Sequence, residues 1–331
     1  MDPLISVVMP VRDGGEYLTA AVDSILAQSF EDLELVLVDD HSEDSSIDHL
    51  DKTDLRLRIL KSNGCGLVDA CNTGFAHSRG RFVARMDADD ISLPDRLARQ
   101  LNYLRQNPEI GIAGCCVEIF SAQGIQGGLE RYEKWLNSVR TPRQVHHQIF
   151  IESPLPNPGV MLRREVLQKL DGYRSNDWPE DYDLWLRADA AGILMGKPDP
   201  VLLRWREHGN RLTHTDALYE RQRFMQAKVH FLVRERLDER PVIIWGAGPT
   251  GRQIHDLIIA EDGIVVGFIE VHPRRIGGQK RGLPVWSMDK VADISAEMLL
   301  IAVGAAGARQ QIADFLQMQG KSEGQDYLFV A

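Results

Sequence analysis

Residues 82–90 read FVARMDADD, a short apolar run that ends in a group of acidic residues. The first five residues have the length and character of a buried strand, and Asp87, Asp89 and Asp90 follow directly. Carboxylates one residue apart at a strand end repel each other and raise each other's pKa unless a cation neutralises them. Oxygen ligands suit magnesium or manganese, and substrate phosphates complete the coordination shell. The stretch therefore favours metal-plus-diphosphate chemistry, with an acidic first turn of a helix as the structural alternative.

The chain around this stretch alternates apolar runs with helix-like segments. Strands are predicted at residues 5–9, 33–38, 56–60 and 82–86, and helices at 16–28, 68–78 and 94–106. Strands that alternate with helices indicate an α/β fold with a mostly parallel sheet covered on both faces. Ligands of such sheets bind beyond the carboxyl ends of the strands. The acidic pairs after residues 38 and 86 lie at these ends.

Length and charge limit the classes of protein to consider. At 331 residues the chain is long enough for two cores, and we place a domain boundary between residues 238 and 239. The formal net charge of −10 argues against nucleic acid as a partner. The first five residues lack the basic region of a signal peptide, and no apolar run has the length of a membrane span. We therefore expect a cytoplasmic location.

The four cysteines carry no metal-site or disulfide pattern. They stand at positions 65, 71, 115 and 116, without C-x-x-C spacing and without histidines at the spacing of zinc ligands. Such a pattern is typical of buried or idle thiols in a reducing compartment.

Several motifs in the first 210 residues resemble one family. They read ISVVMPVRDGGEYLTAAVDSILAQSFEDLELVLVDDHSEDSS, NTGFAHSRGRFVARMDADDISLPDRLARQ, NPGVMLRREVLQKLDGY and EDYDLWLR. This part of the chain resembles glycosyltransferase family 2, the inverting enzymes of GT-A fold. The resemblance implies transfer of a sugar from a nucleoside-diphosphate sugar, with a UDP-sugar expected, to an acceptor hydroxyl. The acceptor would be a polysaccharide, a lipid-linked glycan or another glycoconjugate, so peripheral association with a membrane stays open.

The resemblance also implies roles for single residues. The residues of the donor nucleotide site would be Pro10, Val11, Asp13, Asp39, Asn72 and Asp87. The D-x-D pair of Asp87 and Asp89 would bind Mn²⁺ or Mg²⁺, with Asp89 the stronger candidate for direct contact. A histidine, either His208 or His214, would complete the metal shell or contact the diphosphate.

Glu180 and Asp181 match the acidic pair on the acceptor side of the family's site. The resemblance makes Asp181 the general base, because an acceptor hydroxyl must lose its proton as it attacks the anomeric carbon. The structural alternative is a surface acid in the first turn of a helix. Two positions depart from the family pattern. Asn157 stands where relatives often have His, and the Arg that often precedes Asn72 is absent.

A second motif lies near the C-terminus. The sequence GAGPTG at residues 246–251 follows a predicted strand and opens a predicted helix, as the dinucleotide fingerprint requires. Its glycines, Gly246, Gly248 and Gly251, would allow close approach of a phosphate, and Glu270 is the acid expected about twenty residues on. Residues 239–331 resemble the Rossmann-like domains of sugar-modifying enzymes. Nucleotide or nucleotide-sugar binding and a purely structural role both stay open for this domain.

Three other functions compete with sugar transfer. An NAD-dependent oxidoreductase built on the C-terminal glycine loop would leave the N-terminal acids unexplained. A non-catalytic nucleotide-sugar sensor would bind the donor without releasing diphosphate. A nucleotidyltransferase would need a glycine-rich basic loop after the first strand, which PVRDGG at residues 10–15 matches only weakly.

Overall fold

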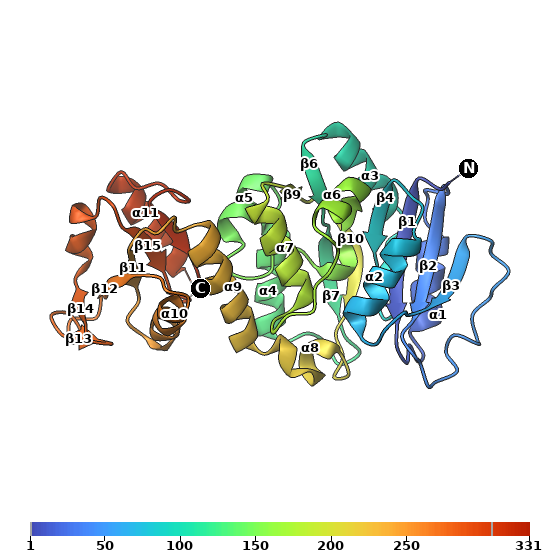
Figure 1. Ribbon diagram of the computed structural model, residues 1–331, viewed down its shortest axis with the longest axis horizontal. Coiled ribbons are helices and arrows are strands. Elements are labelled where there is room, and N and C mark those ends of the chain that lie inside the picture. The colour runs from blue at the N-terminus through green and yellow to red at the C-terminus, as the bar shows by residue number, and fades with distance from the viewer. Residues whose placement is uncertain (1, 306) are drawn as a thin grey trace. The chain divides into compact units, whose positions relative to one another are not determined.

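A computed structural model describes residues 2–305 and 307–331, which form two compact units. The first unit contains the chain up to residue 145 together with residues 154–218, and the second contains residues 146–153 and 219–331. Both are layered α/β structures (Figure 1). The domain boundary predicted between residues 238 and 239 therefore falls within the second unit, which already includes residues 219–238.

Helix α9 (Arg221–Glu235) explains this difference from the expected boundary. This helix precedes the predicted boundary but belongs to the second unit. The Nζ of Lys228, which is buried in α9, donates to the carbonyls of Ile151 at 2.8 Å and Val330 at 3.1 Å. Both partners belong to the second unit, so this helix ties the 146–153 segment to the C-terminus.

The first unit is built on a seven-stranded sheet of order β3-β2-β1-β4-β8-β6-β9. The four strands predicted from the sequence are parallel, and β8 pairs antiparallel with both β4 and β6. The bounds of these strands are β1 Ile5–Val11, β2 Leu33–Asp39, β3 Leu57–Lys61, β4 Phe82–Arg85, β6 Ile110–Ala113, β8 Met161–Arg163 and β9 Leu194–Gly196. The mostly parallel sheet between helices confirms the predicted fold class.

Alternating side chains of the parallel strands bury both faces of this sheet. Ile5, Val7 and Met9 of β1 belong to the core that also contains buried residues of α1 (Leu18–Leu26) and α3 (Arg96–Gln106). The other face meets α2 (Leu67–His77) so closely that a Cβ on Gly74 would lie 2.3 Å from Val8. Helix α2 is therefore held directly against the strands that lead to the acidic loops.

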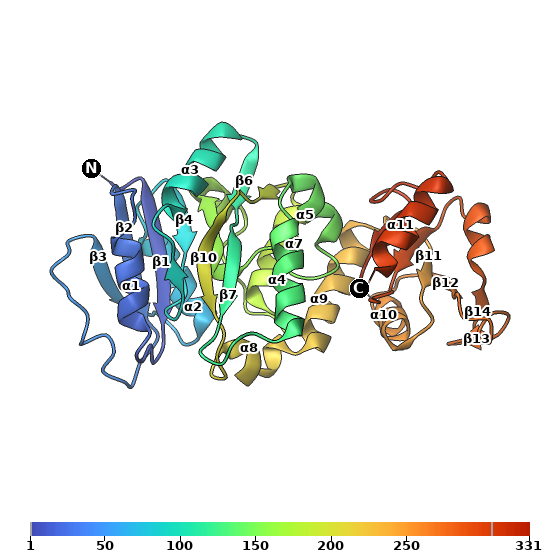
Figure 2. The same ribbon diagram turned by 180° about the vertical axis from the view of Figure 1, so that it is seen from behind.

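A three-stranded sheet and further helices complete the first unit. The strands are β5 Ile91–Ser92, β10 Val201–Arg206 and β7 Cys116–Phe120, in the order β5-β10-β7. The helices are α4 Gly127–Ser138, α5 Pro142–Gln148 (which runs on into the second unit), α6 Arg164–Lys169, α7 Glu180–Ala190 and α8 Leu212–Thr215. Strand β5 directly follows the acidic loop and pairs with β10. The view from behind shows β10 beside its other partner, β7 (Figure 2).

The second unit has a six-stranded sheet of order β13-β14-β12-β11-β15-β16. All its pairings are parallel except β13 with β14. The bounds are β11 Val242–Trp245, β12 Val265–Ile269, β13 Gln279–Lys280, β14 Leu283–Trp286, β15 Met298–Ile301 and β16 Tyr327–Phe329, with helices α10 Pro249–Ala260 and α11 Ala308–Met318. The chain runs from β11 outward through β12 to β14 and then returns to the other side of β11. The order of the strands thus reverses between β11 and β15.

All four cysteines are free thiols, and three of them are buried. Burial raises the pKa of Cys71 and Cys115 to about 12, so these two thiols are inert at neutral pH. Among residues 2–305 and 307–331, no helix combines the length and apolar content that crossing a bilayer requires.

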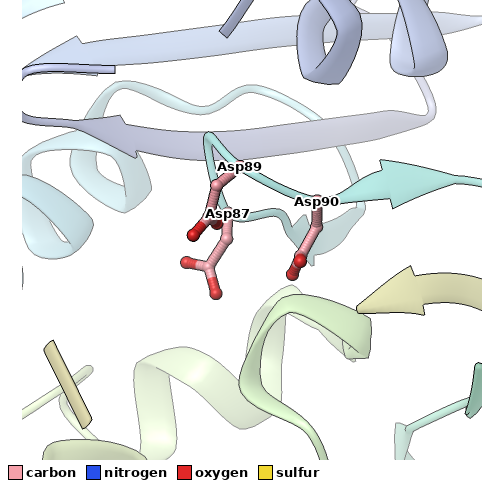
Figure 3. A group of neighbouring side chains, drawn as sticks. All are labelled: Asp87, Asp89 and Asp90. Carbon is pink, nitrogen blue, oxygen red and sulfur yellow. The ribbon is translucent and has the colours of Figure 1, made fainter. Parts of the chain in front are cut away.

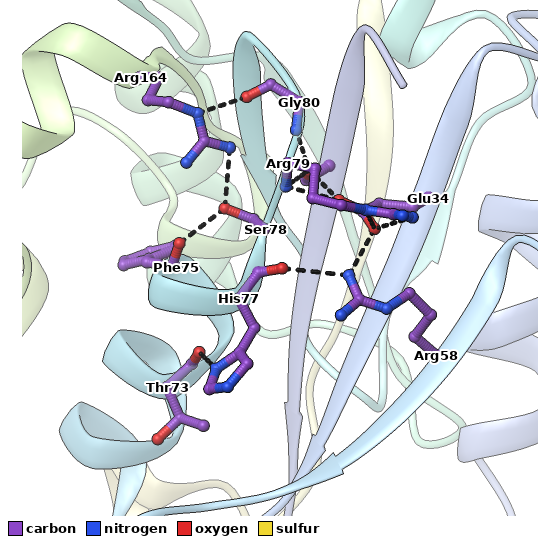
Figure 4. Close-up of polar contacts among 10 residues, drawn as sticks. Glu34, Arg58, Thr73, Phe75, His77, Ser78, Arg79, Gly80 and Arg164 are labelled. Carbon is purple, nitrogen blue, oxygen red and sulfur yellow. Dashed lines mark hydrogen bonds and ion pairs between the residues drawn. The ribbon is translucent and has the colours of Figure 1, made fainter. Parts of the chain in front are cut away.

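A buried carboxylate joins the amino ends of the parallel strands (Figure 4). Glu34 of β2 is 2% exposed, accepts a hydrogen bond from Ser6 at 2.6 Å, and pairs with Arg58 at 2.7 Å and Arg79 at 2.8 Å. Burial alone would raise the pKa of Glu34, but the hydrogen bonds from Ser6, Arg79 and Arg58 outweigh it and lower the pKa to about 2. The ionised group therefore stabilises the fold.

Replacing Glu34 with Gln should cost about 3 kcal/mol of stability near neutral pH, because a drop in pKa of this size corresponds to that free energy. The pKa is lower in the folded chain than in the unfolded chain. The stabilisation is therefore present above the ordinary glutamate pKa and disappears as the pH falls toward about 2. Calorimetric unfolding at several pH values measures this, with the exposed Glu31→Gln as control. Equal melting temperatures for Glu34→Gln and wild type would contradict it.

Candidate active site

The residues expected to line the nucleotide pocket come together at the carboxyl ends of β1 and β2. These strands are parallel, with Pro10 opposite Val38 and Val11 opposite Asp39. The loops that follow both strands therefore start side by side. In an open α/β sheet this edge is where ligands bind.

Asp13 connects these two loops. Its backbone is left-handed, with φ of 52°, and its Oδ1 accepts hydrogen bonds from the amides of Glu43 at 2.7 Å and Asp44 at 3.3 Å. The Oδ1 of Asp39 accepts from the amide of Ser42 at 2.9 Å, and the Oγ of Ser42 accepts from the amide of Asp13 at 3.1 Å. Asp13 and Asp39 are thus fixed through one shared loop and remain partly open to solvent.

Three carboxylates gather in the loop that follows β4. Asp87, Asp89 and Asp90 extend from this loop with their carboxylates on the same side of it (Figure 3). One oxygen of each lies within 4.8 Å of the others, a spacing that suits ligands of a single cation. Asp87 and Asp89 are partly exposed, whereas Asp90 is buried.

Burial and charge repulsion raise the pKa of Asp89 and Asp90. Burial and then the charge of Asp87 raise the pKa of Asp89, against a hydrogen bond from His208. Burial and the charges of Asp87 and Asp89 raise the pKa of Asp90 well above the usual value. The buried Oδ2 of Asp90 has no hydrogen-bond partner in the described parts of the chain. Oxygen ligands, unbalanced charge and an unpartnered oxygen all fit a divalent cation such as Mg²⁺ or Mn²⁺.

The end of β10 and the residues after it contact this cluster. Of the two candidate histidines, His208 takes part in these contacts and His214 does not. The Nε2 of His208 lies 2.8 Å from Oδ2 of Asp89, whereas His214 binds Glu207. Arg206 donates from Nε to the carbonyl of Asp89 at 2.7 Å and from its amide to Oδ1 of Asp90 at 2.7 Å. Of the two histidines, it is therefore His208 that could serve as a ligand beside Asp89.

Glu180 and Asp181 open helix α7, where the helix dipole favours negative charge. Glu180 is buried, and its Oε1 accepts a hydrogen bond from Asn157 at 3.4 Å. Asp181 is partly exposed, and its Oδ1 accepts from the amide of Tyr182 at 2.6 Å. The two acids thus differ in access, and Asp181 is the one that an acceptor could reach.

Burial and then the charge of Glu180 raise the pKa of Asp181 well above that of an ordinary aspartate. The charge of Asp87 adds to this rise. A raised pKa brings a carboxylate nearer to the basicity that a general base needs at neutral pH.

Asn72, expected at the donor site, has an internal partner. Its Nδ2 donates to the carbonyl of Tyr173 at 2.9 Å, and its Oδ1 accepts from the amide of Tyr173 at 3.0 Å. The hydroxyl of Tyr173 donates to Oδ1 of Asn157, which in turn reaches Glu180. Asn157 thus links Tyr173 to the acceptor-side acids, and donor binding by Asn72 stays a prediction.

Two buried charged residues of the site were not singled out from the sequence. Arg85 is 1% exposed and pairs through Nη1 with Asp87. Asp40 is 4% exposed and accepts hydrogen bonds from the amide of Gly66, which precedes helix α2. Both residues are charged and stand at the end of an apolar strand. This pattern could have identified them, because a buried charge needs a partner in the site.

The C-terminal glycines lie in the turn between β11 and α10 and in the first turn of α10. Gly246 has a φ of 116°, Gly248 caps α10, and a Cβ on Gly251 would lie 1.9 Å from the carbonyl oxygen of Gly246. Glu270 is buried at the end of β12 and already pairs with Arg275 at 2.9 Å. It also accepts the amides of the two residues that follow it, at 3.0 and 3.3 Å. The acid expected to bind a ribose thus serves its own loop.

The sheet, the loops beyond its carboxyl edge and the acidic cluster define a nucleotide-diphospho-sugar transferase of GT-A type. The model of glycosyl transferase family 2 matches residues 6–171, and the chain belongs to this family. This membership supports sugar transfer from a nucleotide sugar. The model of the CoA binding domain matches residues 238–322, which fits the Rossmann-like part of the chain.

Similar proteins include bacterial glycosyltransferases. An uncharacterized glycosyltransferase of Haemophilus influenzae is 28% identical over 235 residues, which are 68% of this chain and 71% of the relative. The O-antigen biosynthesis glycosyltransferase WbnJ of Escherichia coli is 29% identical over 225 residues, 65% of this chain and 84% of the relative. The solved structure of S. aureus TarS residues 1–349 with UDP-GlcNAc shares the fold, with a TM-score of 0.56 and 18% identity, covering 72% of this chain and 67% of that one.

Proposed function

We propose that the chain is an inverting, metal-dependent glycosyltransferase that moves a sugar from a nucleoside-diphosphate sugar to a hydroxyl of a polysaccharide or lipid-linked glycan. The observation that carries this proposal is the acidic cluster after β4, together with Asp181 of α7 within reach of its charge. The O-antigen enzyme among its relatives supports a glycan acceptor, and the UDP-GlcNAc complex of TarS supports a UDP-sugar donor.

On the donor side, Pro10, Val11, Asp13 and Asp39 would line the pocket for the nucleoside. Asp89, with Asp87 and His208, would hold Mn²⁺ or Mg²⁺ against the diphosphate. When bound, the cation supplies positive charge that offsets the negative charge developing on the departing diphosphate. The chain's own contribution is to place Asp87 and Asp89 on one loop, with His208 held against Asp89, before the donor arrives.

On the acceptor side, Asp181 would take the proton of the attacking hydroxyl. Its raised pKa suits this transfer, and the buried Glu180 beside it sustains the raised value. Attack on the anomeric carbon from the side opposite the leaving diphosphate gives inversion. A single carboxylate on the acceptor side is sufficient for this displacement.

Calorimetric titration of the whole chain with UDP, GDP, dTDP and NAD, each with and without manganese, tests the proposal. Manganese-dependent binding of one diphosphate supports the transferase site and identifies the donor's base. Binding of NAD alone, indifferent to manganese, would contradict it and favour an oxidoreductase. Diphosphate binding without release of sugar from any donor would favour a nucleotide-sugar sensor.

We propose a second, separate function for the C-terminal unit, namely binding of a phosphate-containing nucleotide such as CoA or a nucleotide sugar. The strand order reverses between β11 and β15, and open α/β sheets bind ligands at such a point. Gly248 follows β11 and Gly304 follows β15. Neither has a positive φ, and a Cβ on either would meet no described atom within 4 Å. Room for a ligand accounts for glycine at both positions.

The ion pair and hydrogen bonds that already occupy Glu270 favour a ligand that binds through phosphate groups. A dinucleotide such as NAD needs a free carboxylate for its ribose hydroxyls, and the oxygens of Glu270 are occupied by Arg275 and two amides. Arg221 and Arg252 lie near the start of α10, within the same unit, and add positive charge there. A CoA or nucleotide-sugar ligand therefore fits better than NAD.

Gly248→Val should weaken binding of such a ligand about tenfold or more, because added methyl groups fill space that the phosphate needs. Titration with CoA, UDP-GlcNAc and NAD measures the effect. Gly128→Val is the control, because a Cβ at Gly128 of α4 also meets no described atom within 4 Å. If none of these ligands binds the wild-type chain, the unit is a structural module and the second proposal is wrong.

A further inference from the structure

Arg85 occupies a central position in the first unit. It is the last residue of β4 and lies opposite Val8 of β1, the strand against which Gly74 of α2 packs. Its side chain is 1% exposed, and its charge acts on Cys71 of α2 and on Tyr173. A guanidinium in such surroundings is costly unless acids compensate for it.

The acid that compensates Arg85 directly is Asp87, on the donor side. Nη1 of Arg85 pairs with Oδ1 of Asp87, while the Nε of Arg85 is buried with no hydrogen-bond partner among the described residues. The backbone of Arg85 is also fixed, because its amide donates to Val160 at 2.9 Å and its carbonyl accepts from Arg96 at 2.5 Å. The orientation of the Asp87 carboxylate is therefore set by a rigid, buried cation.

We propose that Arg85 is a positioning residue for the donor side of the site: its buried guanidinium orients the carboxylate of Asp87 toward the metal. The inference rests on the proposed glycosyltransferase function. It means that metal binding depends on a buried cation that is not itself a ligand of the metal.

Arg85→Gln and Arg85→Lys in the full chain separate the contributions of charge and geometry. Glutamine removes the charge and the planar fork, whereas lysine keeps the charge and loses the fork. The matched control is Arg163→Lys, because Arg163 of β8 also uses its guanidinium inside the fold but binds the carbonyls of Ile110 and Leu104 in place of an acid. The readouts are melting temperature, manganese affinity in the presence of UDP or GDP, and affinity for UDP or GDP without manganese.

Both Arg85 variants should bind manganese about 10- to 100-fold more weakly, as is usual when a group that orients a metal ligand is lost. The affinity for UDP or GDP without manganese should stay at the wild-type value in both variants, because Arg85 is buried and pairs with Asp87. Arg163→Lys should lower the melting temperature without changing either affinity. Wild-type manganese affinity in Arg85→Lys would overturn the proposal, even if Arg85→Gln does not fold. So would an equal loss of manganese-free affinity, which would indicate a structural role. Absence of diphosphate binding by the wild-type chain would instead refute the proposed function.

Discussion

Asp89→Asn should abolish the manganese-dependent part of nucleoside-diphosphate binding. Asp89 is the acid whose carboxylate lies next to His208, and it shares its loop with two further carboxylates. An amide keeps the shape of the side chain but loses the charge that attracts a divalent cation. Substitutions that only support a metal ligand cost about 10- to 100-fold in affinity, so loss of the ligand itself should cost at least about a hundredfold.

Calorimetric titration of UDP and GDP at fixed manganese concentration measures this loss. Asp95→Asn is the matched control, because Asp95 precedes α3 a few residues further on and its side chain is 56% exposed. If the acids of this region served only to stabilise a helix start, Asp95→Asn would be the more damaging change and Asp89→Asn would bind manganese as the wild type does. That result would remove the metal site from the proposal.

The parallel half of the main sheet could be predicted from the sequence because its signals are local. Each strand is a short apolar run, each helix has a periodic apolar face, and the acids follow the strands directly. The observed β1, β2, β3 and β4 begin and end within a few residues of the predicted ones. Parallel pairing then places their carboxyl ends together without any knowledge of tertiary contacts.

Elements whose stability comes from distant contacts were not predictable. Helix α4 begins with Gly127 and Gly128, and helix propensity alone does not favour a helix there. Asn137 of this helix exchanges hydrogen bonds with the backbone of Val117 at 2.9 and 2.7 Å, and Leu136 is fully buried. Tertiary packing thus outweighs the poor helix propensity of glycine.

The same distinction applies to the site. The positions of Asp87 and Asp89 follow from a strand end, so sequence reasoning found them. The contacts of Arg206 with Asp89 and of Asn157 with Tyr173 and Glu180 join segments far apart in the chain. Only folding brings such partners together, and no spacing rule along the sequence would identify them.

Asp181→Asn should retain manganese-dependent donor binding and reduce sugar transfer by about 10²- to 10⁴-fold, the usual contribution of a general base. The amide can still accept a hydrogen bond from the amide of Tyr182, as Oδ1 of Asp181 does at 2.6 Å, so helix α7 should start as before. It cannot take a proton from the acceptor hydroxyl at neutral pH. Donor binding by calorimetry and diphosphate release in the same preparation separate the two effects.

The pH dependence of the wild-type enzyme makes this prediction specific to a base. Because burial and Glu180 raise the pKa of Asp181, the active carboxylate form should be lost at a higher pH than for an ordinary aspartate as the solution is acidified. This loss of activity on acidification should be absent from the residual activity of Asp181→Asn. The exposed Asp177→Asn should keep both this pH dependence and the wild-type rate. If Asp181→Asn turns over like the wild type, another group accepts the proton. A uniform loss of donor binding and turnover would instead mean that Asp181 serves the structure of the pocket, because a base contributes to the transition state and not to donor affinity.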